Sequence, residues 1–396
     1  IDMPHDQPPT LPAPDATSAA HSERVAAFIR ERIAAAGGRV SFAEFMQHAL
    51  YAPGLGYYAA GSTKFGEAGD FITAPEVSSV FGGVVARQCA EVLEQTDGGE
   101  ILEYGAGSGR LAADVLTALR RMDALPSGYN ILEVSADLRE RQEVRLRECV
   151  PDLMERIHWL DSPPAASRGV ILANEVLDAL PVERFVRRDS GVMQQCVAEG
   201  PGGFEFVETA ASARLAGAVG AIEDEIGAQV PDGFVSEVSL AVPGWIAGLS
   251  AALDEGVVLL FDYGVSRREY YAAERSDGWL RCHFRHHAHN NPLVLTGIQD
   301  LTTWVDFTAV AEAAVAAGFE IAGYSAQAQF LMAGGLEAEM QGFAELALEE
   351  QLELSRQVKT LTLPGEMGEH FKCMALQKGA IATPSGFSLA DRTHVL

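Results

Sequence analysis

Three alternating glycines form the most chemically suggestive feature of the sequence. The segment Glu103 to Gly109, EYGAGSG, follows a short apolar stretch and precedes residues 111–121, which are predicted to be a helix. Glycines in such a turn accept positive φ and let a ligand approach the backbone. The N-terminus of the following helix favours an anionic group. The predicted contacts of a nucleoside cofactor within the turn are Gly105, Ala106, Gly107 and Gly109.

Acidic residues stand where three predicted strands end. Glu103 ends the strand 101–104, Glu133 and Val134 end the second strand, and Asp161 follows the third. Open α/β sheets bind ligands at the carboxyl ends of their strands, and a carboxylate after the second strand can bind both ribose hydroxyls. Glu103 would meet the amino acid end of a methyl donor, and Asp161 would reach its adenine. Gly107 to Ala112 also fits the dinucleotide pattern G-x-G-x-x-A, so the glycines alone leave NAD open.

A second group of acids follows the fourth predicted strand. Asn174 and Glu175 come directly after it, and Asp178 would share a face with Glu175 if a helix starts there. Two carboxylates at this position would suit a guanidinium, which is planar and permanently charged. Glu175 is the candidate to accept the proton that must leave. Acids also cap helix N-termini, so capping remains an alternative. Asp262, after the fifth strand, is either a further wall of the site or a turn residue.

The elements that would position these side chains alternate between strand and helix from residue 100 onward, which predicts a mostly parallel, doubly wound α/β sheet. Antiparallel strands and an Ala-rich helix over 183–240 indicate an insertion, and 264–302 is predicted to be a long His- and Arg-rich loop. Helices are expected over 304–316 and 336–356. The predicted organisation is a disordered tail (1–21), N-terminal helices with a long loop (22–95), a Rossmann-like core (96–182), the insertion (183–240), the rest of the main domain (241–378) and a loose tail (379–396).

The amino-acid composition restricts the classes of molecule that the protein is expected to bind. The net charge of −26 disfavours nucleic acid, and it either attracts a basic protein segment or serves solubility alone. The sequence contains no uncharged apolar stretch long enough to span a membrane, so membrane insertion is not expected. The five cysteines are widely spaced, and no signal or transit peptide is recognised, so a cytoplasmic location is expected. Four histidines between His283 and His289 lack acids or cysteines at convincing spacing, so no metal is expected. The oligomeric state cannot be inferred.

Seven segments together resemble the MidA-like family of S-adenosylmethionine-dependent methyltransferases. They occur in the family's order and lie at Tyr51–Tyr58, Gly69–Ser78, Leu102–Gly109, Leu132–Ser135, Asn174–Val182, Phe261–Gly264 and Gln299–Phe307. The resemblance implies a class I methyltransferase fold with added N-terminal helices and an inserted subdomain. It implies cofactor contacts at the glycine turn and Glu133, and it places Thr73 to Ser78 near the cofactor.

The resemblance also implies an acceptor. The family includes an arginine methyltransferase that acts in respiratory complex assembly, so a protein arginine is the favoured methyl acceptor. Two alternatives stay open: an assembly factor that binds S-adenosylmethionine without turnover, and a small-molecule methyltransferase. An NAD-linked oxidoreductase is a remote third, because no Tyr-x-x-x-Lys pattern follows the fourth strand.

Overall fold

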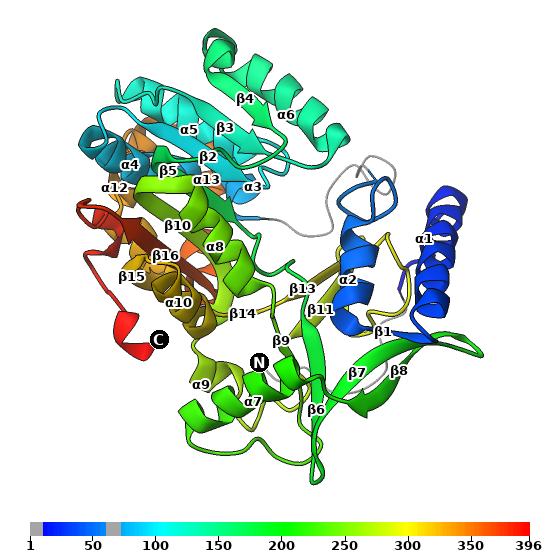
Figure 1. Ribbon diagram of the computed structural model, residues 1–396. Coiled ribbons are helices and arrows are strands. Elements are labelled where there is room, and N and C mark those ends of the chain that lie inside the picture. Colours follow the sequence, from blue (N-terminus) through cyan, green and yellow to red (C-terminus); the bar gives the residue numbers. More distant parts are fainter. Residues whose placement is uncertain (1–10, 61–72) are drawn as a thin grey trace. The chain divides into compact units, whose positions relative to one another are not determined.

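The computed structural model describes residues 11–60 and 73–396, and the chain divides into two compact units (Figure 1). The first unit comprises residues 1–71, 179–240 and 271–303. The second comprises residues 72–178, 241–270 and 304–396. Each unit is therefore assembled from segments that lie far apart in the sequence, and the predicted insertion falls wholly within the first.

A seven-strand path through one sheet forms the centre of the second unit. Its order is β15-β16-β10-β5-β2-β3-β4, with the short β14 paired to β10. All pairs from β10 to β4 are parallel, whereas β16 is antiparallel to both neighbours. This arrangement confirms the predicted α/β class. The strands are β2 (Glu100–Tyr104), β3 (Tyr129–Leu132), β4 (Ile157–Leu160), β5 (Ser167–Asn174), β10 (Leu253–Val265), β14 (Val305–Asp306), β15 (Glu320–Ala326) and β16 (Phe371–Lys378).

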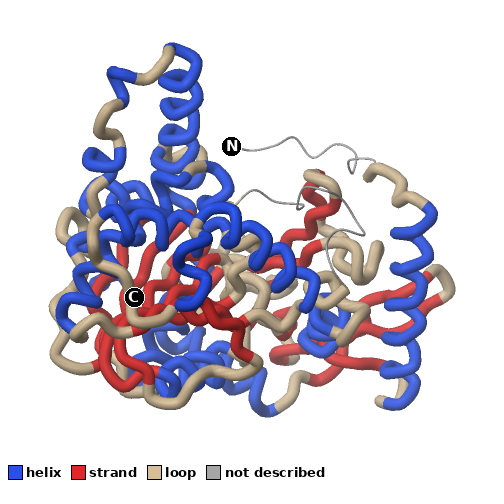
Figure 2. The backbone as a smooth tube through the Cα atoms, turned by 90° about the horizontal axis from the view of Figure 1, so that it is seen from above, coloured by secondary structure: helices blue, strands red, loops and turns tan. Residues whose placement is uncertain are grey.

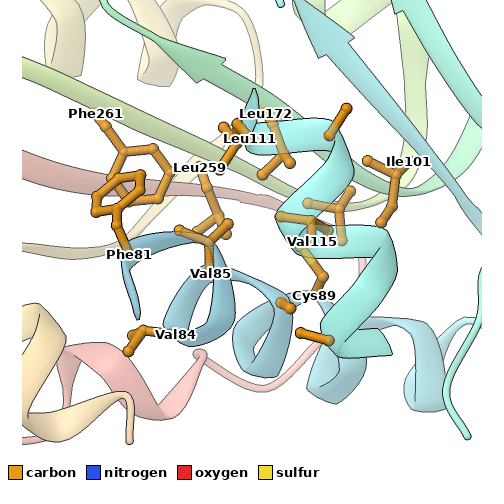
Figure 3. Packing of buried hydrophobic residues seen from close by; sticks show 14 of the residues in the cluster. Phe81, Val84, Val85, Cys89, Ile101, Leu111, Val115, Leu172, Leu259 and Phe261 are labelled. Atoms are coloured by element: carbon orange, nitrogen blue, oxygen red, sulfur yellow. The ribbon is translucent and has the colours of Figure 1, made fainter. Parts of the chain in front are cut away.

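Helices pack on both faces of this sheet, as the backbone trace in Figure 2 shows. On one face, Phe81, Val85 and Cys89 of α4 meet Leu111 of α5 and Phe261 of β10 (Figure 3). On the other face, Tyr104 packs edge-on against Trp245 of α8. The helices of eight or more residues in this unit are α4 (Ser79–Gln95), α5 (Arg110–Arg121), α6 (Ala136–Cys149), α8 (Val242–Ala252), α10 (Phe307–Ala316) and α13 (Leu348–Thr362).

Short elements complete the second unit. They are α3 (Ala74–Val77), α9 (Arg267–Tyr270), α11 (Gln327–Ala333), α12 (Leu336–Glu339), α14 (Met367–His370), and 3-10 turns at Pro151–Arg156, Phe343–Glu345, Ser385–Phe387 and Thr393–Val395. The predicted helix over 336–356 is wrong in part, because Gly342 has a φ of 80° and the chain turns there before α13 begins. The predicted helix from Trp304 starts later, at Phe307, where Asp306 caps it.

The first unit is built on a five-stranded antiparallel sheet. Its order is β1-β7-β6-β9, and β8 pairs with the other side of β7. The strands and helices are α1 (Ala16–Ala35), β1 (Arg39–Ser41), α2 (Phe42–Tyr51), β6 (Glu183–Arg188), β7 (Gly191–Gly200), β8 (Gly203–Ala210), α7 (Ala213–Ile226) and β9 (Val235–Val238). The capping box predicted for α2 is confirmed, since Ser41 accepts from the Glu44 amide and Glu44 accepts from the Ser41 amide.

Three further predictions about order need correction. Asp15 caps α1, so the helix begins at Ala16, five residues before the predicted end of the disordered tail. The predicted loop 264–302 instead contains an antiparallel sheet of β11 (Leu280–Phe284), β12 (His287–His289) and β13 (Asp300–Thr303). The C-terminal tail is packed, because Phe387 is buried against Phe330. In the described ranges, no helix is both long and apolar enough to span a bilayer.

Candidate functional site

The glycine turn adopts the conformation that its sequence predicts. Gly105, Gly107 and Gly109 have φ values of 63°, 52° and 79°, which side chains with a Cβ rarely adopt. Gly109 is the N-cap of α5, so the first amides of that helix point toward the turn. A Cβ on Gly107 would meet nothing within 4 Å, so the backbone there borders open space. The turn can therefore present backbone donors and a helix N-terminus to an anionic group.

One buried glutamine ties the glycine turn to the acid after β3. Gln142 of α6 donates to the carbonyl of Gly107 at 2.9 Å and to Glu133 Oε2 at 3.2 Å. Its own oxygen accepts from the Trp159 indole at 2.9 Å. Glu133 Oε1 accepts from the Ser135 amide at 2.9 Å. A carboxylate has four lone-pair positions, so Glu133 keeps capacity for the two hydroxyls of a ribose.

The residues after β3 and β4 expose groups suited to a purine. Val134 follows Glu133 directly and is 77% exposed, which is unusual for a valine. Asp161 follows β4, and its side chain is 93% exposed while it pairs with Arg139 at 2.9 Å. Arg139 also donates to the carbonyls of Glu133 and Leu160, so it joins the two loops. An adenine could rest on Val134 with its amine toward Asp161.

Glu103 differs from the other predicted acids because it is interior. It lies within β2 rather than at its end, is 2% exposed, and accepts from the Tyr129 hydroxyl at 2.7 Å. Burial raises the pKa of Glu103 from its usual 4.5 to about 7, opposed by the Tyr129 hydrogen bond and assisted by the charge of Glu133. Its direct contact with a cofactor stays a prediction; in the structure its side chain is buried and bonded to Tyr129.

The segment Thr73 to Ser78 lies beside the glycine turn. Glu76 of α3 contacts the hydroxyl of Ser108, and Arg145 of α6 donates to both at 3.1 Å and 2.8 Å. Thr73 is the N-cap residue of α3, at the edge of the described range. Ser78 is buried and caps α4 by accepting from the Val80 amide at 3.3 Å. Ser78 therefore has an observed structural role, and the polar neighbour of the turn is Glu76.

No helix follows β5, so the predicted shared face of Glu175 and Asp178 is wrong. Asn174 ends β5 as expected, and residues 175–182 form turns. Glu175 has a φ of 52°, a left-handed conformation that is costly for a glutamate, and its amide donates to the Phe261 carbonyl at 2.8 Å. The Asn174 amide group donates to Glu175 Oε1 at 3.2 Å. Helix capping is thereby excluded as the role of these acids.

Three carboxylates converge in this turn. Asp262 lies inside β10 rather than after it, and one of its oxygens accepts from the amides of Leu177 and Asp178 at 2.9 Å and 3.2 Å. Asp178 is itself buried and accepts from the Tyr263 hydroxyl at 2.6 Å. Burial raises the pKa of Asp262 well above its usual range, and the charges of Asp178 and Glu175 raise it further. The turn therefore concentrates acids near one another, where a bound cation would be favourable.

Two aromatic residues support this acidic turn. Tyr263 packs edge-on against Trp304 and Phe371, with ring centroids 6.1 Å and 5.5 Å apart. Both Tyr263 and Trp304 fall in the motifs Phe261–Gly264 and Gln299–Phe307, so the sequence marked them without assigning a role. Gln142 was missed entirely, because a glutamine within a polar helix carries no local signal.

The histidine-rich segment forms a hairpin of the first unit rather than a long loop: His283 lies on β11, His287 and His289 lie on β12, and His286 lies in the turn between them. Burial lowers the pKa values of His283 and His289. Within the described part of the chain, no group of three or more His, Cys, Asp or Glu residues could hold a metal ion.

Comparison with known proteins agrees with the geometry. Residues 84–325, more than half of the chain, match the family model described as "Putative S-adenosyl-L-methionine-dependent methyltransferase". The chain is 29% identical to the mitochondrial protein arginine methyltransferase NDUFAF7 homolog of Drosophila melanogaster, covering 94% of this chain and 90% of that one. It is 27% identical to the Danio rerio protein of that name, covering 89% and 90%.

Solved structures show the same similarity. A COG1565 superfamily member from Burkholderia thailandensis, bound to S-adenosyl-homocysteine, is 37% identical with a TM-score of 0.91, covering 98% of this chain and 100% of that one. A native structure of a COG1565 protein from the same organism is 36% identical with a TM-score of 0.89 and the same coverage. The predicted class I methyltransferase fold is confirmed.

Proposed function

Because the chain belongs to this family of S-adenosyl-L-methionine-dependent methyltransferases, its cofactor is S-adenosylmethionine, and we propose that it methylates the guanidinium of an arginine in a protein substrate. The observation that carries the proposal is the group of three carboxylates formed by Glu175 and Asp178, which follow β5, and Asp262 of β10. The NAD-linked alternative is overturned by the family match. An assembly factor without turnover is also disfavoured, since the relatives are named as methyltransferases.

Different residues are proposed to bind the sugar, the base and the amino acid end of the cofactor. Backbone amides at Gly105 to Gly109 and the carboxylate of Glu133 bind and orient the cofactor, which when bound supplies an electrophilic methyl group on its sulfonium. Val134 and Asp161 position the base. Placing the acceptor nitrogen in line with that methyl group is expected to contribute most of the rate enhancement, as with other positioned reactants.

Glu175 is proposed to contact the acceptor. It is half-buried, and its left-handed backbone turns it out of the regular path of β5. Its carboxylate would hold one edge of the guanidinium through charge-assisted hydrogen bonds and would accept the proton that leaves the methylated nitrogen. Asp178 and Asp262 are proposed to position Glu175. Asp262 accepts hydrogen bonds from two backbone amides of the turn, and Asp178 accepts one from the Tyr263 hydroxyl.

The acceptor is tested by incubating the purified protein with a methyl-labelled donor and a lysate of cells that lack it, followed by mass spectrometry of the labelled product. The expected result is a label on an arginine side chain of a protein. A label found only on a small molecule, or on another protein side chain, would overturn the arginine proposal while leaving the cofactor assignment intact.

A basic segment around the target arginine is expected, because the chain's net charge is −26. The location is a separate matter. The curated relatives are named as mitochondrial, whereas the solved structures come from a bacterium. A cytoplasmic location therefore stays a prediction, tested by fractionating cells and probing each fraction for the native chain.

A further inference from the structure

Residues 332–353 of the second unit carry an exposed apolar surface that the methyl-transfer site does not use. Met332 is exposed, and Met332, Met340 and Phe343 line an open hollow of about 750 Å³. The chain then runs through residues 344–350, all of which are exposed. Leu348 and Leu352 are 70% and 63% exposed and lie one helical turn apart on α13. We call this the 332–353 surface.

Contacts from α12 hold this surface against α4 and α5 of the second unit. Glu339 is the anchor, because it accepts from Arg87 of α4 at 2.9 Å and from Arg121 of α5 at 2.7 Å. Gln351 donates to the Ala344 and Leu346 carbonyls at 3.3 Å and 2.9 Å, which folds the exposed turn back onto α13. The exposed apolar groups are therefore held in place by ordered contacts, as expected of a preformed binding surface.

The charge of the surface indicates its partner. Between Leu336 and Ser355 the sequence has six glutamates and no lysine, arginine or histidine. All of them except Glu339 are exposed, and they lie in the same segments as the apolar residues. Methionines and leucines bordered by acids match an amphipathic helix with an apolar stripe and basic flanks. A second copy of the chain would bring glutamates against glutamates, which disfavours self-association here.

We propose that the 332–353 surface docks an amphipathic helix of a partner protein that carries basic residues beside its apolar stripe. The apolar stripe lies in the hollow and against Leu348 and Leu352, and the basic side chains meet Glu345 and Glu349. This docking goes beyond methyl transfer and does not depend on which residue accepts the methyl group.

The test uses a fluorescent synthetic peptide of leucine, lysine and alanine, with its leucines on one helical face, and a scrambled peptide of the same composition. Binding to the full chain is followed by fluorescence anisotropy at two salt concentrations. The native protein is expected to bind the amphipathic peptide at least tenfold more tightly than the scrambled one. Equal affinity for the two would overturn the proposal, since charge alone would then explain the binding.

Two double variants locate the contact. Leu348→Gln/Leu352→Gln is expected to weaken peptide binding by about tenfold or more, because both substitutions remove apolar side chains that the bound peptide would bury. Glu345→Gln/Glu349→Gln is expected to weaken it severalfold and to flatten its salt dependence. Leu389→Gln, at a leucine 60% exposed elsewhere, is the matched control and should bind as the native chain does.

Two further measurements separate the outcomes. Affinity for S-adenosylhomocysteine should be the same in all variants, so a failure of docking is distinguishable from a failure of the cofactor site. Sedimentation should show the same oligomeric state in the native chain and in Leu348→Gln/Leu352→Gln. A native dimer that dissociates in this variant would overturn the proposal and assign the surface to a second copy.

Discussion

The ends of β2 and β3 differ from the ends of β5 and β10 in how their polar groups are held. Around β2 and β3, Gln142 bridges the glycine turn and Glu133, and Val134 stays exposed. Around β5 and β10, acids gather, and Asp178 and Asp262 are buried. The first region suits a ligand with one anionic end and an uncharged sugar and base; the second suits a cation. We therefore propose that the cofactor and the acceptor bind at different strands of the same sheet.

Glu133→Ala should have the largest effect of these variants, and the effect should be on cofactor affinity. The variant loses hydrogen bonds to two ribose hydroxyls, each worth roughly 2 kcal/mol to a charged acceptor, so affinity for S-adenosylhomocysteine should fall about a thousandfold by calorimetry. Asp161→Asn, at the exposed end of the same region, is the control and should lose about threefold or less. Retained affinity in Glu133→Ala would remove Glu133 from the site.

Glu103→Gln tests the buried acid of β2 through the stability of the protein. The folded-state pKa of Glu103 is raised to about 7, so ionisation destabilises the native protein as pH rises from about 4.5 through 7. The free energy of unfolding of the variant, relative to that of the native chain, should increase over that pH range and stay constant above it. The difference should reach roughly 3 kcal/mol at pH 8. Chemical denaturation at pH 5 and pH 8 measures this. An equal difference at both pH values would contradict the assignment.

Tyr263→Phe tests whether the acidic turn depends on its supporting hydroxyl. Removing the donor to Asp178 should slow methyl transfer by about tenfold, since a hydrogen bond to a charged group contributes roughly 1.5–3 kcal/mol, part of which is recovered by rearrangement. Affinity for S-adenosylhomocysteine should change less than twofold. Tyr324→Phe, a buried tyrosine of the same sheet, is the matched control for loss of a hydroxyl. Equal rates in native protein and Tyr263→Phe would show that Asp178 needs no such support.

Gly107→Ala should show the smallest effect, and Gly54→Ala is its control. Both glycines have positive φ, 52° and 68°, and a Cβ on either meets nothing within 4 Å. Each variant should lose about 1 kcal/mol of stability from backbone strain. Only Gly107→Ala should also weaken S-adenosylhomocysteine binding, by roughly fivefold, because only that glycine belongs to the proposed cofactor site. Equal affinity in the two variants would place the glycine turn outside the site.

The same contrast explains which parts of the site the sequence could predict. The glycine turn and Glu133 lie within or directly after single strands, so local pattern sufficed to place them. The acidic turn depends on contacts between residues about 85 positions apart, such as Leu177 with Asp262 and Asp178 with Tyr263. No local pattern shows that β10 extends past Asp262, and a left-handed Glu175 is not expected of a glutamate.

The elements of the fold were likewise predictable where local sequence patterns define them. Alternating strands and helices predicted the parallel sheet, and the capping box predicted the start of α2. The misplaced elements were those whose ends depend on tertiary contacts. β11 to β13 form strands only because they pair with one another, and the tail is ordered because Gly386 and Phe387 pack against Gln88 and Phe330.

The separation of the two regions is tested most directly by single-turnover methyl transfer with Glu175→Gln at saturating methyl donor. The variant keeps the shape of the side chain and removes its charge and basicity, and a general base contributes roughly 100-fold or more. The account predicts at least a hundredfold slower transfer by a protein that binds S-adenosylhomocysteine as tightly as the native one. Transfer at the native rate would contradict it.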